Sequence, residues 1–208
     1  MNKLALLGAS GRGKVVADAA LAAGWKHVVF FDDAWPGVRV NGRWPVVGDM
    51  TVLMSRLPEF DGVLVAIGNC AVRWRKQQEL RSAGARLATV VHPRACVSSY
   101  AQLGEGSVVM AGAVVNVDAT VGEAGIVNTG ATVDHDCVLA AGVHVSPGAH
   151  LSGNVKVGSC SWVGVGVSVR QGMLIGAGVV VGAGAVVVKS VADDQTVVGS
   201  PAAPLVPR

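Results

Sequence analysis

The chain has 208 residues, which suits one large domain or two small ones. It is rich in Gly, Val and Ala, with 4% aromatic and 15% charged residues, a composition that excludes a disordered chain and a conventional aromatic-rich core. The net charge of +3 comes from scattered Lys and Arg residues and indicates no nucleic-acid binding.

The apolar runs are too short for a signal peptide or a membrane span, so we expect no membrane insertion. The four cysteines show neither CxxC spacing nor a paired pattern, and they are Cys70, Cys96, Cys137 and Cys160. This usage favours a reducing, cytoplasmic environment.

Residues 1–93 alternate between predicted strands and helices, a pattern typical of a Rossmann-like βαβ domain. The predicted elements in chain order are a strand over 4–7, a glycine loop over 8–13, a helix over 14–23, a strand over 27–31, a strand over 62–67, a helix after 68–69 and a strand over 87–91. Residues 92–93 begin the connection to the next domain.

The glycine loop between the first strand and the first helix has the spacing GxxGxG. Backbone N–H groups and the helix dipole at such a loop face a phosphate, and Asp32 and Asp33 at the end of the next strand are placed to accept ribose hydroxyls. A glycine turn of any βα unit fits the same residues. The domain has about half the length of a full dinucleotide fold, so we expect a mononucleotide moiety rather than NAD.

From Val97 to Val187 an aliphatic residue stands at every sixth position, sixteen times in succession. The residue two before each aliphatic is small or apolar, and the residue three after it is Gly, Asn or Asp in twelve of sixteen cases. Those three residue types tolerate the left-handed backbone conformation of a tight corner.

The period predicts a left-handed parallel β-helix over residues 94–191, followed by a C-terminal tail over 192–208. Each hexapeptide is a short strand plus a corner, and three of them close a triangular coil. The repeat predicts about five coils, stacked roughly 4.8 Å apart by parallel ladder hydrogen bonds. The aliphatic residue and the small residue both point inward.

Three of the five histidines lie in this repeat. His135 occupies a corner, where Asp134 and Asp136 flank it, whereas His144 and His150 precede inward aliphatic residues and point outward from flat faces. A neighbouring carboxylate fixes the tautomer of an imidazole and raises its basicity, although Asp is favoured at the position of Asp136 in any corner. The corner of His135 lies opposite the face of His144, so a site that uses both must lie between two subunits.

Other readings of these residues are open. Trp162 follows His144 by one coil on the same outward face, which places that face in a groove or an interface. Cys137 takes an inward position, which favours core packing over a nucleophile. A zinc site would need His135, His144 and His150 to converge on one ion, and the register places them apart, so no metal is expected.

The chain resembles the bacterial sugar acetyltransferases that include the bacillosamine-route UDP-4-amino-sugar N-acetyltransferases, perosamine N-acetyltransferase and the sialic acid O-acetyltransferases. The segments that carry the resemblance span the chain, and they are 8–16, 31–33, 66–69, 92–93, 128–130, 133–137, 144–149 and 199–202.

The resemblance implies that His135 is a general base assisted by Asp136, that His144 contacts acetyl-CoA, and that Val165 and Ala183 line the CoA groove; Trp162 is placed with them by its face. It implies that the nucleotide sugar is held by Ser10, Gly11, Arg12, Asp32, Asp33, Gly68 and Asn69. Arg12 stands where the family has His, and Cys70 stands where a second Asn is common. Arg12 is suited to pair with a diphosphate.

The sequence thus predicts a homotrimeric acetyltransferase that moves the acetyl group of acetyl-CoA to the amine of a nucleotide-linked 4-amino sugar. O-acetylation of a sialic acid or related sugar uses the same base and is the nearest alternative. A non-catalytic β-helix protein that binds nucleotide sugars is the alternative of another class.

Overall fold

The computed structural model describes residues 2–205 and divides into two compact units, Met1–Pro93 and Arg94–Arg208. None of the helices within the described residues is long and apolar enough to cross a membrane.

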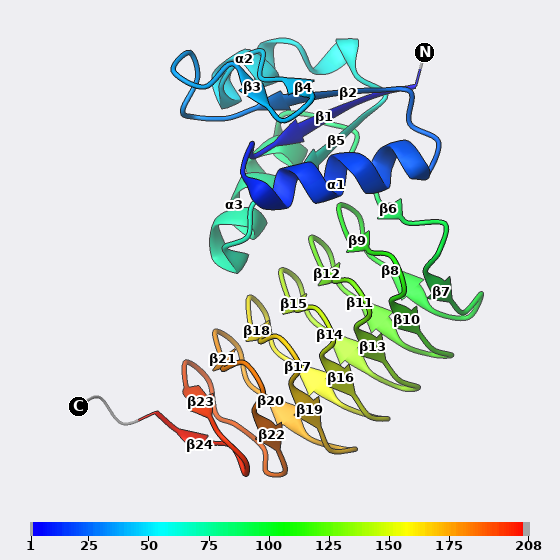
Figure 1. Cartoon of the computed structure of the whole chain (residues 1–208), viewed down its shortest axis with the longest axis vertical. Coiled ribbons are helices and arrows are strands. Elements are labelled where there is room, and N and C mark those ends of the chain that lie inside the picture. Colours follow the sequence, from blue (N-terminus) through cyan, green and yellow to red (C-terminus); the bar gives the residue numbers. More distant parts are fainter. Residues whose placement is uncertain (1, 206–208) are drawn as a thin grey trace. The chain divides into compact units, whose positions relative to one another are not determined.

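The first unit is built on a three-stranded parallel sheet (Figure 1). Its strands, in the order β2-β1-β5, are His27–Phe31, Lys3–Leu7 and Gly62–Val65. All four residues of β5 and the last four of β1 are buried. Strands covered on both faces read as continuous apolar runs, which is why the sequence shows no alternation here.

Helices and one hairpin follow these strands. They are α1 (Gly11–Ala22), the hairpin of β3 (Val40–Asn41) and β4 (Trp44–Pro45), α2 (Met50–Ser55), the 3-10 helix η1 (Leu57–Glu59) and α3 (Cys70–Ser82), with β6 (Val90–Val91) last. Helix α1 starts three residues before the expected Lys14, so half of the predicted glycine loop is the first helical turn. The hairpin, α2 and η1 had no counterpart in the predicted elements.

The second unit is a parallel β-helix with three faces (Figure 1). Face I contains β7 (Cys96–Val97), β10 (Val114–Val115), β13 (Thr132–Val133), β16 (His150–Leu151), β19 (Ser168–Val169) and β22 (Val186–Val187). Face II contains β8 (Gln102–Leu103), β11 (Thr120–Val121), β14 (Val138–Leu139), β17 (Lys156–Val157) and β20 (Leu174–Ile175). Face III contains β9 (Val108–Val109), β12 (Ile126–Val127), β15 (His144–Val145), β18 (Trp162–Val163) and β21 (Val180–Val181).

The register of the ladders pairs residues that are eighteen apart, for example Val115 with Val133 and Val127 with Val145. The aliphatic residues from Val109 to Val187 are at most 2% exposed, and the small residues two before them are also buried. The predicted inward positions are confirmed. The core is a column of stacked small side chains, which explains why so few aromatic residues are needed.

Fourteen of the sixteen corners carry a positive φ at the third position after the inward aliphatic, and the exceptions are Tyr100 and Ser190 at the two ends of the repeat. This holds at the expected Gly, Asn and Asp residues, such as Asp118 (φ 57°) and Asp136 (φ 59°), and also at Ala124 (φ 52°) and Cys160 (φ 58°). Inside the repeat the corner therefore imposes this conformation even on Ala124 and Cys160, which do not favour it.

The β-helix has about six coils rather than five, because face I contains six strands. The segment after Val187 continues the structure with a shorter step: Val191 bridges to Ile175, sixteen residues earlier. Strand β23 (Thr196–Val198) then extends face III, and β24 (Ala203–Pro204) pairs with it in the antiparallel sense.

Candidate active site

The residues expected to hold a nucleotide sugar lie after the carboxyl ends of the three parallel strands. Ser10 and Gly11 follow β1, Asp32 and Asp33 follow β2, and Gly68 follows β5. In open α/β sheets, ligands bind in the crevice outside these strand ends. The structure brings the predicted set to one edge of the sheet.

The glycines of the loop have different tasks. Gly8 has φ 113°, and a Cβ there would lie 2.9 Å from the Ile67 side chain. A Cβ on Gly13 would overlap the Gly8 carbonyl oxygen. Gly11 has no atom within 4 Å of an added Cβ. Gly8 and Gly13 are therefore required by the fold, whereas the open space at Gly11 is available to a ligand.

The two aspartates after β2 also differ. Asp32 accepts hydrogen bonds from the backbone N–H of Ala9 at 2.7 Å and of Ala34 at 2.9 Å, so its carboxylate ties the glycine loop to the end of β2. Asp33 is exposed, and its carboxylate lies 3.9 Å from Lys76 Nζ. The carboxylate of Asp33 is therefore open to solvent, whereas that of Asp32 shapes the loop beside it.

Two arginines meet at Gly68. Arg73 is 1% exposed and donates from Nη1 to the carbonyls of Ile67 at 3.0 Å and Gly68 at 3.1 Å. Arg12 Nε would lie 3.3 Å from a Cβ on Gly68. Partial burial, together with the charge of Arg73, lowers the pKa of Arg12. Two cations at the start of α1 and α3 make this edge strongly attractive to phosphate.

Asn69 completes this edge as the N-cap of α3, because its Oδ1 accepts the N–H of Val72 at 3.0 Å. Ser10 is the N-cap of α1, but its side chain makes no cap hydrogen bond. Its carbonyl accepts the Asn41 side-chain amide at 3.1 Å. The Ser10 hydroxyl remains near the loop without a capping task.

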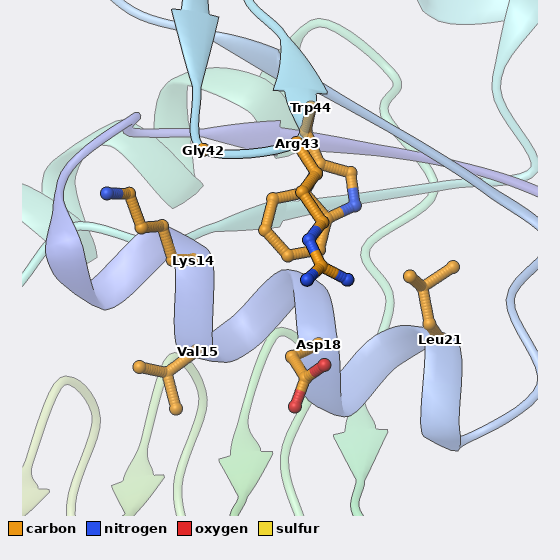
Figure 2. Close-up of a pocket in the computed structure, with 7 residues that line it drawn as sticks. All are labelled: Lys14, Val15, Asp18, Leu21, Gly42, Arg43 and Trp44. Carbon is orange, nitrogen blue, oxygen red and sulfur yellow. The ribbon is translucent and has the colours of Figure 1, made fainter.

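A groove of about 590 Å³ runs beside this loop, between α1 and the β3–β4 hairpin. Figure 2 shows Arg43 and Trp44 extending from the hairpin over α1, which contributes the other side chains. The lining residues are Lys14, Val15, Asp18, Leu21, Gly42, Arg43 and Trp44. None of the residues expected to hold the nucleotide lines it.

In the β-helix, His135 lies on the edge between faces I and II, after β13. Its Nδ1 donates to Asp136 Oδ2 at 2.7 Å, and this bond raises the pKa of His135 above its ordinary value. In the neutral ring the proton then resides on Nδ1, so Nε2 carries the free lone pair. The side chain is 56% exposed. The pair has the geometry of a solvent-accessible general base.

Asp134 holds the backbone of the same corner. Its Oδ1 accepts the His135 N–H at 2.8 Å and the Asn116 side-chain amide at 2.8 Å, and these bonds lower the pKa of Asp134. Asn116 was not among the predicted site residues. It precedes Asp134 by eighteen residues, so the repeat places it at the position of Asp134 one coil earlier.

His144 lies on face III and is covered although it points outward from the strand. It is 3% exposed, as is Ile126 one coil earlier on the same face, and the ring of Trp162 stacks on it with ring centroids 6.2 Å apart. Asn128 Nδ2 lies 3.2 Å from His144 Nε2 and donates to it. Trp162 Nε1 donates to Ser146 Oγ at 2.6 Å. The prediction placed His144 and Trp162 correctly on one face but missed Asn128 and the shielding of the imidazole.

Val165 and Ala183 lie one coil apart on the edge between faces III and I, joined by the hydrogen bond from Gly184 N to the Val165 carbonyl at 2.8 Å. Both are exposed, as is the outer part of Trp162. In a triangular cross-section the I/II edge of His135 lies opposite face III. A single β-helix therefore separates His135 from His144.

The competing readings fit less well. Cys137 is fully buried, its Sγ donates to the Ser152 carbonyl at 3.2 Å, and burial raises its pKa, so it is a core residue. His150 lies on face I, where its Nδ1 is 3.0 Å from Thr132 Oγ1. Within residues 2–205 no group of three His, Cys, Asp or Glu side chains is placed to hold a metal ion.

Comparison with known proteins identifies the family of the chain. The sequence profile of the PglD N-terminal domain matches residues 3–80. The acetyltransferase domain of PglB from Neisseria gonorrhoeae, solved in complex with acetyl coenzyme A, is 48% identical, with 98% of this chain and 99% of that chain covered and a TM-score of 0.93. The chain belongs to the PglD family of nucleotide-sugar N-acetyltransferases.

Other PglD-family proteins show the same relationship. A histidine-to-asparagine variant of perosamine N-acetyltransferase from Caulobacter crescentus, solved with CoA and GDP-perosamine, is 36% identical over 100% of this chain and 98% of that chain, with a TM-score of 0.95. The UDP-N-acetylbacillosamine N-acetyltransferase of Bacillus subtilis is 37% identical over 113 residues, which is 53% of this chain and 52% of that protein. The match therefore spans about half the length of this curated relative.

Proposed function

We propose that the protein transfers the acetyl group of acetyl-CoA to the amine of a nucleotide-linked 4-amino sugar, with His135 as the general base. The observation that carries this proposal is the hydrogen bond from His135 Nδ1 to Asp136 on an exposed edge of the β-helix. Family membership indicates the reaction class, and the hydrogen-bonded pair of His135 and Asp136 provides the general base.

The N-terminal unit, residues 1–93, holds the nucleotide. Gly11 offers space, Arg12 and the start of α1 face the diphosphate, and Asp33 accepts a ribose hydroxyl. Gly68 and Asn69 close the other side of the crevice, at the start of α3. Ser10 contributes a hydroxyl that its helix does not use for capping.

The β-helix holds acetyl-CoA along face III and the adjoining edge. His144 is fixed there by Asn128 and Trp162, and the exposed surfaces of Trp162, Val165 and Ala183 provide apolar contact area for the pantetheine arm. Large exposed apolar side chains on one face indicate a surface that is covered in the working protein.

The active site lies between subunits of a homotrimer. His135 is on the edge opposite face III, so the His135 of one chain reaches acetyl-CoA only when that thioester lies on face III of a neighbour. A closed ring of three identical interfaces gives every chain one complete site.

The proposed reaction is direct transfer in a ternary complex. The sugar amine attacks the thioester carbonyl carbon while His135 Nε2 takes a proton from the nitrogen. The tetrahedral species then expels the CoA thiolate, and the imidazolium returns the proton to that sulfur. General-base assistance of this kind contributes roughly 10²–10⁴-fold to the rate, and the remainder comes from orientation.

The test is a mass-spectrometric assay of the protein with acetyl-CoA and a panel of UDP-, GDP-, dTDP- and CMP-linked amino and hydroxy sugars. We expect one amino-sugar nucleotide to gain a single acetyl group. His135→Ala should lower kcat about 10²–10⁴-fold, whereas the matched variant His150→Ala, on face I, should stay within twofold. Absence of acetyl transfer to every acceptor, or full activity of His135→Ala, would contradict the proposal.

A further inference from the structure

The second residue of each β-helix corner follows the inward aliphatic by two positions. In fifteen of the sixteen hexapeptides it has a side chain, and the exception is Gly153. The fifteen others are Ser99, Glu105, Ala111, Val117, Glu123, Thr129, His135, Ala141, Pro147, Ser159, Val165, Gln171, Ala177, Ala183 and Lys189. A glycine is therefore not a requirement of this corner.

The backbone of Gly153 does not require glycine either. Its φ lies outside the left-handed region, unlike the φ of Gly148 or Gly166 in neighbouring corners. An alanine would adopt this conformation without strain. The reason for the glycine must lie in what surrounds it.

What surrounds it is the imidazole of His135, which lies on the same edge one coil earlier. A Cβ on Gly153 would overlap Cε1 and Nε2 of His135 and would lie 3.1 Å from Cδ2. The two coils are joined at this point, because Asn154 N donates to the His135 carbonyl at 2.9 Å. The ring of His135 thus lies directly against the backbone of Gly153.

We propose that Gly153 is a positioning residue for His135, and that its missing side chain lets the imidazole lie along the edge of the prism. Its consequence for acetyl transfer rests on the proposed function. Two contacts fix the ring: Nδ1 is held by Asp136 at 2.7 Å, and the Cε1–Nε2 edge rests on Gly153. A side chain at residue 153 would occupy the space that the Cε1–Nε2 edge of the imidazole now fills. The ring must then shift, and we expect its hydrogen bond to Asp136 to be weakened.

The first test is Gly153→Ala in the full-length protein. We expect kcat to fall about tenfold to a hundredfold, because a displacement of about 1 Å has this effect on a reacting group. KM for both substrates should stay within twofold, and the melting temperature should change by at most about 2 °C. Ser159→Val, which adds bulk at the same corner position on another edge, serves as the control and should leave all three unchanged.

The second test reads the imidazole itself. In an NMR titration with ¹³C-labelled histidine, the pKa of His135 should be lower in Gly153→Ala than in the wild type, since the shifted ring has a weaker bond to Asp136. This readout does not depend on turnover, so it tests the positioning role even if the proposed reaction proves wrong. An unchanged pKa of His135 would overturn the inference.

The third test is a double-variant cycle with His135→Ala. If Gly153 acts through the imidazole, Gly153→Ala should not reduce the residual rate of His135→Ala any further. An equal loss in both backgrounds would mean that Gly153 acts independently of His135, and the inference would fail.

Discussion

The β-helix and the N-terminal sheet differ in how their functional residues can be recognised. In the β-helix each position has fifteen counterparts, so a residue that departs from them, such as the lone glycine at residue 153, stands out. The N-terminal sheet has no internal repeat. There only the contacts separate a residue that the fold needs, such as Gly13, from one that is left to a ligand, such as Gly11.

The comparison teaches that a repeat supplies its own controls. The same substitution can be made at a corner with a catalytic role and at a corner without one. The difference in activity between the two variants then measures the catalytic contribution. The N-terminal unit offers no such pairs, so variants there must be compared with chemically similar residues in another contact.

The largest effect is expected from complementation in the β-helix. His135→Ala and His144→Asn subunits, each inactive alone, are mixed and allowed to exchange. If each site combines His135 of one chain with His144 of another, an equal mixture should regain roughly a quarter of the wild-type activity, because random assembly restores both histidines at about that share of all interfaces. Verified subunit mixing without any recovery would place the whole site within one chain.

In the N-terminal unit, Arg12→Ala should weaken binding of the nucleotide sugar about tenfold to a hundredfold, as expected for loss of charge-assisted hydrogen bonds to a diphosphate. Titration calorimetry measures this directly, and NAD should not bind to either protein. Arg43→Ala is the control, because Arg43 lines the separate groove beside α1. A larger loss for Arg43→Ala than for Arg12→Ala would move the diphosphate into that groove.

The smallest change in kcat is expected at Asp136, which has two roles. It forms the corner with φ 59°, and its carboxylate accepts the hydrogen bond from His135. Asp136→Gly keeps the corner and removes the carboxylate, whereas Asp118→Gly makes the same change one coil earlier on the same edge. We expect kcat to fall about three- to tenfold in Asp136→Gly only. Stability of both variants should stay within about 0.5 kcal/mol of the wild type.

The pH dependence of kcat tests the same carboxylate. A general base works in its neutral form, so kcat falls as the pH drops below the pKa of His135, which Asp136 raises. Without the carboxylate that pKa declines, and the acid limb of the Asp136→Gly profile should move to lower pH. An acid limb that stays in place would show that Asp136 does not tune the imidazole.

Much of the fold could be predicted because every hexapeptide has an aliphatic residue that marks its inward position. The strand pairs of the β-helix follow from the spacing of Val109, Val127 and their equivalents, and the corner of His135 follows from Val133. The start of α1 was predicted too late, because Gly11 and Gly13 are poor helix formers and tertiary packing overrides that propensity. The β3–β4 hairpin was missed because each of its strands has only two residues and, unlike the equally short strands of the β-helix, belongs to no repeat.

The candidate site was predicted in outline and not in its contacts. Sequence spacing placed His135, His144 and Trp162 on the correct edge and face. It could not show that Asp32 is bonded to the backbone of Ala9, or that Arg73 reaches the carbonyl of Gly68. Those contacts depend on side-chain direction across different elements, and a one-dimensional period does not record it.

The shortened final coil affects how the protein associates with itself at high concentration. A β-helix that simply stopped would expose unpaired N–H and C=O groups on all three faces, and such edges template end-to-end filament growth. Here Val191 bonds to the Leu174 carbonyl, Ala202 to the Val186 carbonyl, and β24 lies along the edge of β23. Pro204 in β24 has no N–H to donate. The segment over 191–204 thus covers the open edges of the last coil and opposes end-to-end association at that end of the β-helix.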